Sequence, residues 1–272
     1  MNHSPSSIPS KFLKLERGSS DFIAYNRFNK KNKSLPEILF LGGFHSDMTG
    51  TKATFLESIC EKRDQTYTRF DYFGHGASSG SFAQGTIGQW LSDTLAMIDE
   101  VTRGPLILVG SSMGGWLMTL AALARPTRVR ALIGIASAPD FTEELIWASL
   151  NEGRRKDFMR QGMIQTPSQY EEAGFPITLQ LIEEGREHLV LPKDIDIHCP
   201  VHLIHGEADK DVPWTFSSRL AQRIKSPEVT LTLIKNGDHR LNSTLALGRL
   251  ASVLNEVSHL ENNQLTEAPV AS

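Results

Sequence analysis

A serine framed by glycines ends one apolar run of this sequence. In "PLILVGSSMGGWLM", residues 105–118, the pattern Gly-x-Ser-x-Gly is met by Gly110, Ser112 and Gly114, whereas Ser111 lacks glycines two residues away on either side. Such glycines are a steric need where a strand turns sharply into a helix, and the serine at the tip of that turn can act as a nucleophile. The same residues also allow a simpler interpretation, a serine that only caps the helix.

A nucleophilic serine needs a histidine that removes its proton and a carboxylate that orients this histidine. On parallel-sheet scaffolds with this turn, the acid and then the histidine follow in loops after later strands. The run "VHLIHG" leads into "EADKDVPW", where Asp209 is the preferred acid and Asp211 the rival. The run "VTLTLI" leads into "KNGDHRLN", which places His239 before the last helix. We therefore predict Ser112, Asp209 and His239 as a catalytic triad.

An acyl-transfer site also needs N–H donors for the oxyanion of its intermediate. The residue after the nucleophile, Met113, supplies one donor, and the loop after the first parallel strand supplies the other. In that loop, "LGGFHSDMTGTKA", two glycines let the backbone approach the substrate, and Phe44 is the predicted donor. His45 could contact substrate, although an ordinary loop histidine is the simpler interpretation.

Two other stretches contain residue types found in metal or nucleotide sites. The spacing of these residues, however, supports neither kind of site. In "HCPVHLIHGE", His202 and His205 lie three residues apart on a predicted strand and so point to opposite faces, whereas metal ligands need a common face. In "DYFGHGASSG" the glycine spacing is G-x-G-x-x-x-G, and no apolar helix follows directly, unlike a dinucleotide fingerprint. We predict no metal and no cofactor.

The elements that would position these residues alternate along the chain. Short apolar runs, typical of buried parallel strands, lie at 38–41, 67–71, 106–110, 132–136, 201–205 and 229–234. Helix-like stretches lie between or after them at 51–63, 86–101, 113–125, 214–224 and 241–254. This βα alternation predicts a mostly parallel sheet. Two shorter runs, "KFLKLERG" and "DFIAYNRF", predict an antiparallel hairpin at the sheet edge.

The alternation stops between residues 140 and 200, where we find helix-like segments and no obvious strand. "EELIWASLNEGRRKDFMRQGM" and "ITLQLIEEGREHL" have amphipathic patterns, which predicts a helical cap over the carboxyl edge of the sheet. The expected organisation is a flexible N-terminus over 1–10, one domain over 11–257 with this insertion, and a flexible tail over 258–272.

Composition narrows the class of protein. Hydrophobic residues make up 40% and charged residues 22%, with a formal net charge of −3 and scattered cations, which disfavours nucleic acid as the main partner. The two cysteines form no CxxC pair, so a reducing compartment fits. We find neither a signal peptide nor an apolar run long enough to span a membrane, and so expect a soluble cytoplasmic protein.

The residues resemble a known family as well. The stretches "HSDMTGTKA", "RFDYFGHGASSG", "GPLILVGSSMGGWLM", "RVRALIGIASAPDFTEEL", "LIHGEADKDVPW" and "GDHRL", spread over about residues 38–255, are similar to the serine α/β-hydrolase superfamily. Within it they resemble the small depalmitoylase and acyl-glucuronide esterase branch of mitochondria and bacteria. One departure is the oxyanion loop, which begins Leu-Gly-Gly-Phe where many members have His-Gly.

The resemblance implies the α/β-hydrolase fold, a mostly parallel sheet with helices on both faces and a small cap. It also implies the same triad, and hydrolysis of acyl esters or thioesters, with an acylated protein as one substrate and the mitochondrial matrix as the compartment in a eukaryote. Another serine hydrolase on this fold, such as a peptidase, lipase or C–C hydrolase, stays open as an alternative. So does a non-catalytic binding protein on the same scaffold.

Overall fold

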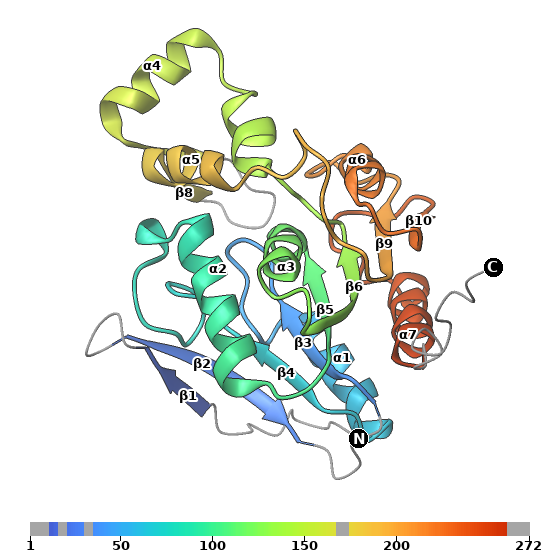
Figure 1. Cartoon of the computed structure of the whole chain (residues 1–272). Helices are drawn as coiled ribbons and strands as arrows, with labels where there is room; N and C mark the ends of the chain where they lie inside the picture. The colour runs from blue at the N-terminus through green and yellow to red at the C-terminus, as the bar shows by residue number, and fades with distance from the viewer. Residues whose placement is uncertain (1–10, 16–20, 30–34, 167–173, 260–272) are drawn as a thin grey trace, which may run out of the picture.

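The computed structural model describes residues 11–15, 21–29, 35–166 and 174–259. Within them a central eight-stranded sheet lies between two layers of helices (Figure 1). The strands of this sheet, in spatial order, are β1 (Lys11–Lys14), β2 (Phe22–Phe28), β4 (Tyr67–Phe70), β3 (Glu37–Leu41), β5 (Leu106–Ser111), β6 (Val129–Ile135), β9 (Val201–Gly206) and β10 (Val229–Ile234). The helices are α1 (Thr51–Lys62), α2 (Ile87–Ala96), α3 (Met113–Ala124), α4 (Glu152–Gln161), α5 (Leu179–Gly185), α6 (Thr215–Arg223) and α7 (Thr244–Ser258).

The predicted parallel sheet and edge hairpin are both confirmed. From β4 to β10 every neighbouring pair is parallel, whereas β1 pairs antiparallel with β2 and β2 with β4. The central strands are buried on both faces, which explains their uninterrupted apolar sequences. Because parallel strands all end at one edge, the loops after β3, β5, β9 and β10 meet there.

Four of the described helices begin at a residue whose side chain caps them. The hydroxyls of Thr86, Thr178 and Ser243 and the amide oxygen of Asn151 accept the N–H of the residue three positions on, at the start of α2, α5, α7 and α4. The predicted helix over 86–101 forms as α2 and a π-helical turn, Met97–Val101. The helix layers therefore lie close to their predicted positions.

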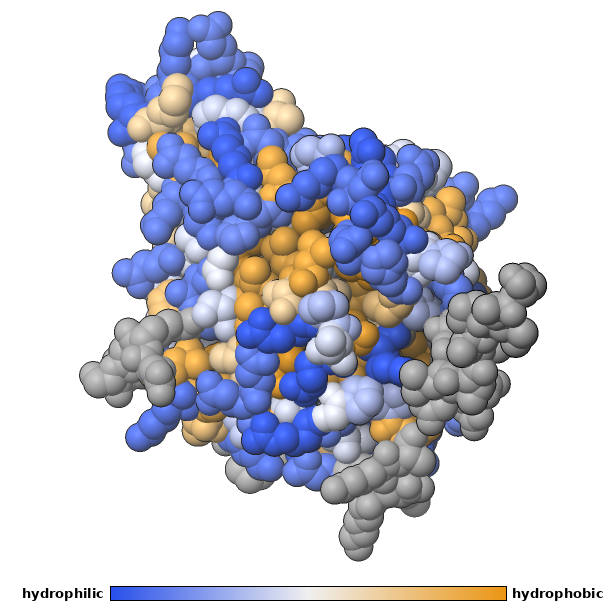
Figure 2. All heavy atoms as spheres, in the orientation of Figure 1, coloured by the Kyte–Doolittle hydropathy of each residue, from blue (hydrophilic) through white to orange (hydrophobic). Residues whose placement is uncertain are grey.

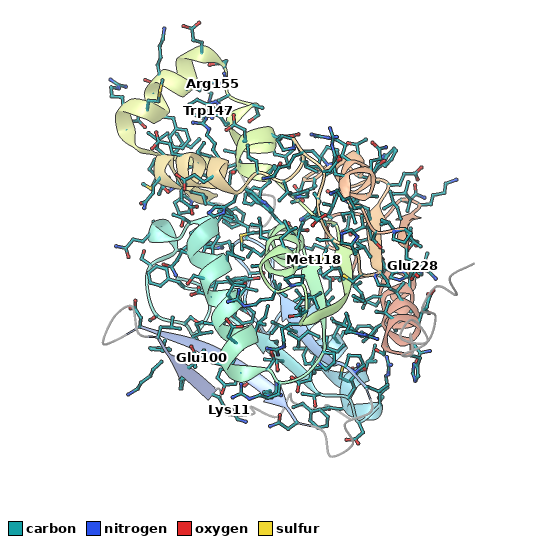
Figure 3. All side chains as sticks on the ribbon, viewed as in Figure 1. Lys11, Glu100, Met118, Trp147, Arg155 and Glu228 are labelled. Atoms are coloured by element: carbon teal, nitrogen blue, oxygen red, sulfur yellow. The ribbon has the colours of Figure 1, made fainter. Side chains whose placement is uncertain are left out.

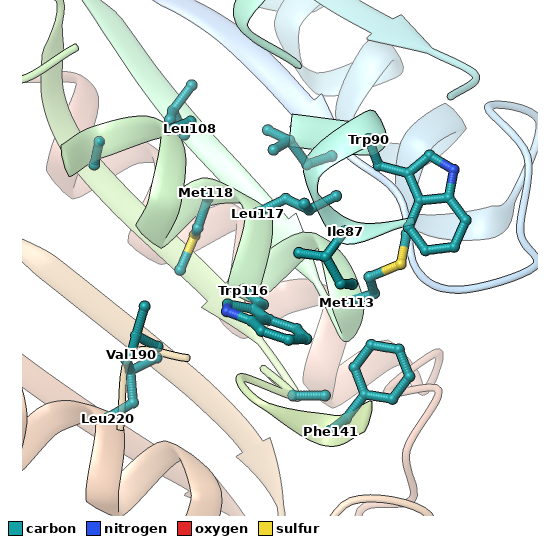
Figure 4. Close-up of a cluster of buried hydrophobic side chains, with 14 of the residues drawn as sticks. Ile87, Trp90, Leu108, Met113, Trp116, Leu117, Met118, Phe141, Val190 and Leu220 are labelled. Carbon is teal, nitrogen blue, oxygen red and sulfur yellow. The ribbon is translucent and has the colours of Figure 1, made fainter. Parts of the chain in front are cut away.

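Two apolar cores hold the layers together. On one face, α1 and α7 pack on the sheet through residues such as Leu56 and Leu254. On the other, α2, α3 and α6 cover the sheet, and Trp90, Trp116 and Met118 are fully buried there (Figure 4). Burying a large apolar side chain stabilises a fold by roughly 1.5–3 kcal/mol. These two cores hold the helices against the sheet and so fix the edge at which the loops after β3, β5, β9 and β10 meet.

The cap between β6 and β9 differs from its prediction. It contains a two-stranded antiparallel sheet of β7 (Met163–Thr166) and β8 (Phe175–Thr178), so the expectation of no strand is wrong. The first predicted helix is also broken, into a π-helical turn at Thr142–Trp147 and then α4. The second begins only at Leu179, because residues 175–178 pair with β7. Amphipathic spacing could not reveal this pairing.

Specific contacts fasten the cap to the sheet domain. Buried Asp140 accepts the backbone N–H groups of Val190 and Leu191, which joins the two ends of the cap. Glu144 in the cap pairs with Arg219 of α6. Within the cap, Arg155 and Arg186 lie over the Trp147 ring, at 5.2 and 4.8 Å from its centroid. Arg155 and Trp147 are labelled near the top of the molecule in Figure 3. The cap thus has internal contacts of its own, and it is fixed to the sheet domain where its two ends meet.

The outer surface of the cap is mostly hydrophilic around α4, whereas hydrophobic residues gather below it on the same face of the molecule (Figure 2). Among the described residues, no helix is both long and apolar enough to cross a membrane. The flexible ends predicted at 1–10 and 258–272 lie outside the described residues, except for 258 and 259, which end and follow α7. The domain boundaries stay predictions.

Candidate active site

Ser112 lies at a strained turn between β5 and α3. Its backbone has φ 55° and ψ −117°, a conformation that L residues seldom adopt and that persists where the surrounding structure enforces it. Although Ser112 precedes α3, its hydroxyl makes no capping hydrogen bond. It lies 3.0 Å from Nε2 of His239 instead. The helix-cap interpretation therefore does not describe this side chain.

The glycines around Ser112 are required by close backbone contacts. A Cβ on Gly110 would lie 2.2 Å from the carbonyl oxygen of Gly114, and a Cβ on Gly114 would lie 2.1 Å from that of Leu41. Both separations are far below van der Waals contact, and backbone atoms cannot swing away as a flexible side chain can. The Gly-x-Ser-x-Gly spacing is thus a packing requirement of this strand-to-helix turn.

His239 joins Ser112 to Asp209. The ring lies in the loop after β10, with Nε2 toward the Ser112 hydroxyl and Nδ1 2.7 Å from Oδ2 of Asp209. Asp209 lies after β9, and its side chain is completely buried, whereas that of His239 is 17% exposed. The structure therefore brings the three residues of the predicted triad into one hydrogen-bonded chain.

The carboxylate of Asp209 is held at both oxygens. Its Oδ1 accepts the backbone N–H groups of Asp211 and Val212, each at 2.9 Å. Burial alone would raise the pKa of Asp209, but hydrogen bonds from His205, His239 and the Val212 backbone, with the nearby charge of His239, hold that pKa well below its usual range. Asp209 is therefore an anion at neutral pH. The rival Asp211 is exposed and supplies its backbone N–H to this arrangement.

The two residues predicted to donate N–H groups to an oxyanion line the same cavity as Ser112. Phe44, in the loop after β3, and Met113, at the first position of α3, both line a cavity with Ser112 and His239. Within the described ranges neither N–H has a hydrogen-bond partner, as expected at a helix start for Met113. These are the two donors predicted for the oxyanion.

The loop that carries Phe44 is fastened to the loop after β4. The buried ring of His75 accepts the N–H of His45 at Nε2, 3.3 Å away, and faces the Phe73 carbonyl with Nδ1. Burial lowers the pKa of His75 to about 4, so the ring is neutral at neutral pH. The carboxylate of Asp71 accepts the N–H of Met48 at 2.6 Å. The glycine-rich sequence "DYFGHGASSG" gives no local sign of these two contacts, because both depend on how the loops after β3 and β4 pack together.

Two cavities meet at Ser112 and His239. One, of about 310 Å³, is lined mainly by apolar residues of the sheet domain and the cap, namely Met113, Ala138, Phe141, Leu145, Ile146, Ile177 and Val212. The other, of about 440 Å³, has a polar wall of His45, Ser46, Asp47, Thr51, Lys52, Arg240 and Asn242. Phe44 and Phe175 line both, and His45 contacts Phe175 with ring centroids 4.6 Å apart. We call the first cavity the apolar compartment and the second, after its polar wall, the polar compartment; Ser112 lines both.

The histidines considered for a metal have other partners. His202 bonds to Thr230 and His205 to Ser217, on different sides of β9. Ligand atoms of Asp209, Asp211 and His239 lie within 4.8 Å of one another. However, Asp209 and His239 already share a 2.7 Å hydrogen bond, as an acid and its histidine do. We assign this cluster to proton transfer rather than to a metal.

Comparisons with known proteins show the family to which the chain belongs. The model of the alpha/beta hydrolase family matches residues 38–249, so the chain belongs to this family, as its sequence resemblance implied. It is a hydrolase of ester-type bonds.

Within the family, the chain is similar to particular proteins and solved structures. The chain is 40% identical over 244 residues to palmitoyl-protein thioesterase ABHD10, mitochondrial, of Rattus norvegicus, covering 89% of this chain and 81% of the relative. The solved structure of alpha/beta hydrolase domain-containing protein 10 from mouse matches with a TM-score of 0.84 and 39% identity, over 91% of this chain and 97% of the mouse one. A putative hydrolase from Agrobacterium vitis matches with a TM-score of 0.88 and 35% identity, over 92% and 98%.

Proposed function

We propose that this protein hydrolyses acyl thioesters and esters through Ser112, His239 and Asp209. The observation that carries the proposal is the continuous chain of hydrogen bonds from the Ser112 hydroxyl through His239 to the Asp209 carboxylate. Its members come from three separate loops at one edge of the sheet. A buried anion behind the histidine stabilises the imidazolium that forms when the serine gives up its proton.

In the proposed reaction, Nε2 of His239 takes the proton of Ser112 while the serine oxygen bonds to the acyl carbonyl carbon. The oxygen of the tetrahedral intermediate accepts the N–H groups of Phe44 and Met113. As the intermediate collapses, the bond to the thiol or alcohol breaks, and this group leaves with the proton from His239. A water then gives its proton to His239, attacks the acyl-enzyme and releases the acid, and Ser112 regains its proton.

The two cavities support a placement of the substrate. The acyl chain fits the apolar compartment, because its wall removes hydrocarbon from water, at about 25 cal/mol for each Å² buried. The polar compartment suits a leaving group with hydrogen-bonding atoms, such as the cysteine of an S-acylated protein. The name of the similar proteins, palmitoyl-protein thioesterase, supports this substrate class. It also includes the word mitochondrial, so we propose the mitochondrial matrix in a eukaryotic source and the cytoplasm otherwise.

Hydrolysis assays test the proposal. The wild-type protein is expected to hydrolyse both short-chain nitrophenyl esters and long-chain acyl thioesters, whereas His239→Gln and Asp209→Asn lose about 10³-fold or more in kcat. Asp211→Asn is the matched control, since its side chain is not the one that bonds to His239. Full activity in Asp209→Asn with loss in Asp211→Asn would reassign the acid. Absence of hydrolysis in the wild type would support a binding protein instead.

A further inference from the structure

A second histidine, besides His239, contacts the carboxylate of Asp209. Nε2 of His205, on β9, lies 3.1 Å from Oδ2 of Asp209 and 2.9 Å from the carbonyl oxygen of Val212. Its Nδ1 lies 2.7 Å from the hydroxyl of Ser217 on α6. The side chains of His205 and Asp209 are both fully buried. Oδ2 of Asp209 is therefore shared by two imidazole rings.

The neighbours of His205 determine where its proton lies. Asp209, ionised at neutral pH, and the Val212 carbonyl can only accept hydrogen bonds, so Nε2 must carry a hydrogen and donate it. Nδ1 is then free to accept the hydroxyl proton of Ser217, which donates and accepts with equal ease. Every polar atom of the ring is paired, as a buried imidazole requires.

Charged residues neighbour this contact in both loops. Oδ2 of Asp209 bonds to both rings, exposed Asp211 follows Asp209 in its loop, and Asp238 and Arg240 flank His239. From α6 the ring meets the neutral hydroxyl of Ser217. The hydrogen bond from His205 therefore changes how much of the negative charge of Asp209 is available to His239.

We propose that His205 is a positioning residue of this site, which holds the Asp209 carboxylate toward His239 and shares its charge. The inference rests on the proposed function. With Nε2 of His205 and Nδ1 of His239 on Oδ2, and two backbone N–H groups on Oδ1, the carboxylate has one orientation. Because His205 donates a hydrogen bond to the same oxygen, it shares the negative charge of Oδ2, and Asp209 stabilises the protonated His239 less strongly than it would alone.

Replacing His205 with a residue whose side chain cannot donate a hydrogen bond to Asp209 tests this role. His205→Phe is expected to lower kcat about tenfold or more, the scale of a lost hydrogen bond to a charged group, with KM within about twofold. The acidic limb of the kcat/KM profile should move to higher pH, because Asp209 then stabilises the His239 imidazolium more strongly. A purely structural role would not move this limb.

The chain offers a matched control and a conservative variant. His202→Phe alters another buried histidine of β9, one that bonds to Thr230 and not to Asp209, so its pH profile should equal that of the wild type. His205→Gln retains an N–H group near the position of Nε2 and should recover most of kcat and the normal acidic limb.

A measurement on the unaltered protein makes the test independent of whether His205→Phe folds. In ¹⁵N NMR spectra of histidine-labelled protein at neutral pH, His205 should be protonated at Nε2. An Nε2 without hydrogen, or an unchanged acidic limb in folded His205→Phe, would overturn the inference. Loss of all hydrolysis in the wild type would instead overturn the proposed function, while the NMR result would still decide the hydrogen bond of His205.

Discussion

Asp71 Oδ1 accepts the backbone N–H of Met48 at 2.6 Å, which ties the loop that carries Phe44 to the loop after β4. Oδ2 of the same carboxylate accepts the N–H of Ala77 at 2.9 Å. Asp71 is only 2% exposed, and a Cβ on Gly76 would lie 2.1 Å from it. One buried side chain thus fixes two loops beside the serine.

Asp71→Ala should therefore weaken both the fold and the site. Two backbone N–H groups lose their acceptor, at roughly 1–3 kcal/mol for each one that stays buried and unpaired. We expect the free energy of unfolding, measured by urea denaturation, to fall by about 2–5 kcal/mol, and kcat to fall with it as Phe44 loses its position. Asp157→Ala is the control, because this exposed carboxylate of α4 pairs with Arg160 on the surface of the cap and lines neither cavity. Equal effects of the two variants would contradict the assignment.

The same carboxyl group should make stability depend on pH. Burial raises the pKa of Asp71 from its ordinary 3.8 to about 6. The folded state then binds this proton more tightly than the unfolded state, so stability is lost as pH rises from about 4 to 6. Asp71→Asn cannot titrate, and the unfolding free energy of the wild type should fall relative to it by about 3 kcal/mol over this range. A difference that stays constant between pH 4 and 7 would refute this.

Two glycine substitutions should have opposite effects. Gly114→Ala places a methyl group against the Leu41 carbonyl, so the turn at Ser112 must move, and activity and stability should both be lost. A Cβ on Gly248, inside α7, would meet no side chain or neighbouring element within 4 Å, and Gly248→Ala should stabilise the protein by about 0.5–1 kcal/mol through helix propensity. Thermal unfolding and ester hydrolysis distinguish these outcomes. An active Gly114→Ala would mean that the turn is not constrained as we describe.

The apolar compartment should set the length of the acyl chain. Ile146 lies on its cap side, and Ile146→Trp would fill part of the space next to Leu145 and Phe141. We expect the ratio of kcat/KM for long-chain over short-chain thioesters to fall about tenfold, since long chains need the lost volume. Leu245→Trp, on the exposed start of α7, should leave the ratio unchanged. A ratio unaffected by Ile146→Trp would place the acyl chain elsewhere.

Local signals explain why much of the site could be predicted. The spacing of the glycines around Ser112 follows from close backbone contacts at one strand-to-helix turn. The loops that hold Asp209 and His239 follow strands with clear apolar runs. The contacts of His205 with Asp209 and Ser217 depend on how β9, its following loop and α6 come together. The β7–β8 pair of the cap likewise depends on tertiary contact between two short segments whose spacing resembles that of a helix. Neither leaves a periodic pattern in the sequence.

The most direct test of the account concerns Ser112 alone. We would treat the wild type, Ser111→Ala and Ser112→Ala with a fluorophosphonate and measure the intact mass of each. We expect one adduct on the wild type and on Ser111→Ala and none on Ser112→Ala, because it is the Ser112 hydroxyl that lies 3.0 Å from Nε2 of His239. An adduct on Ser112→Ala, or none on the wild type, would contradict it.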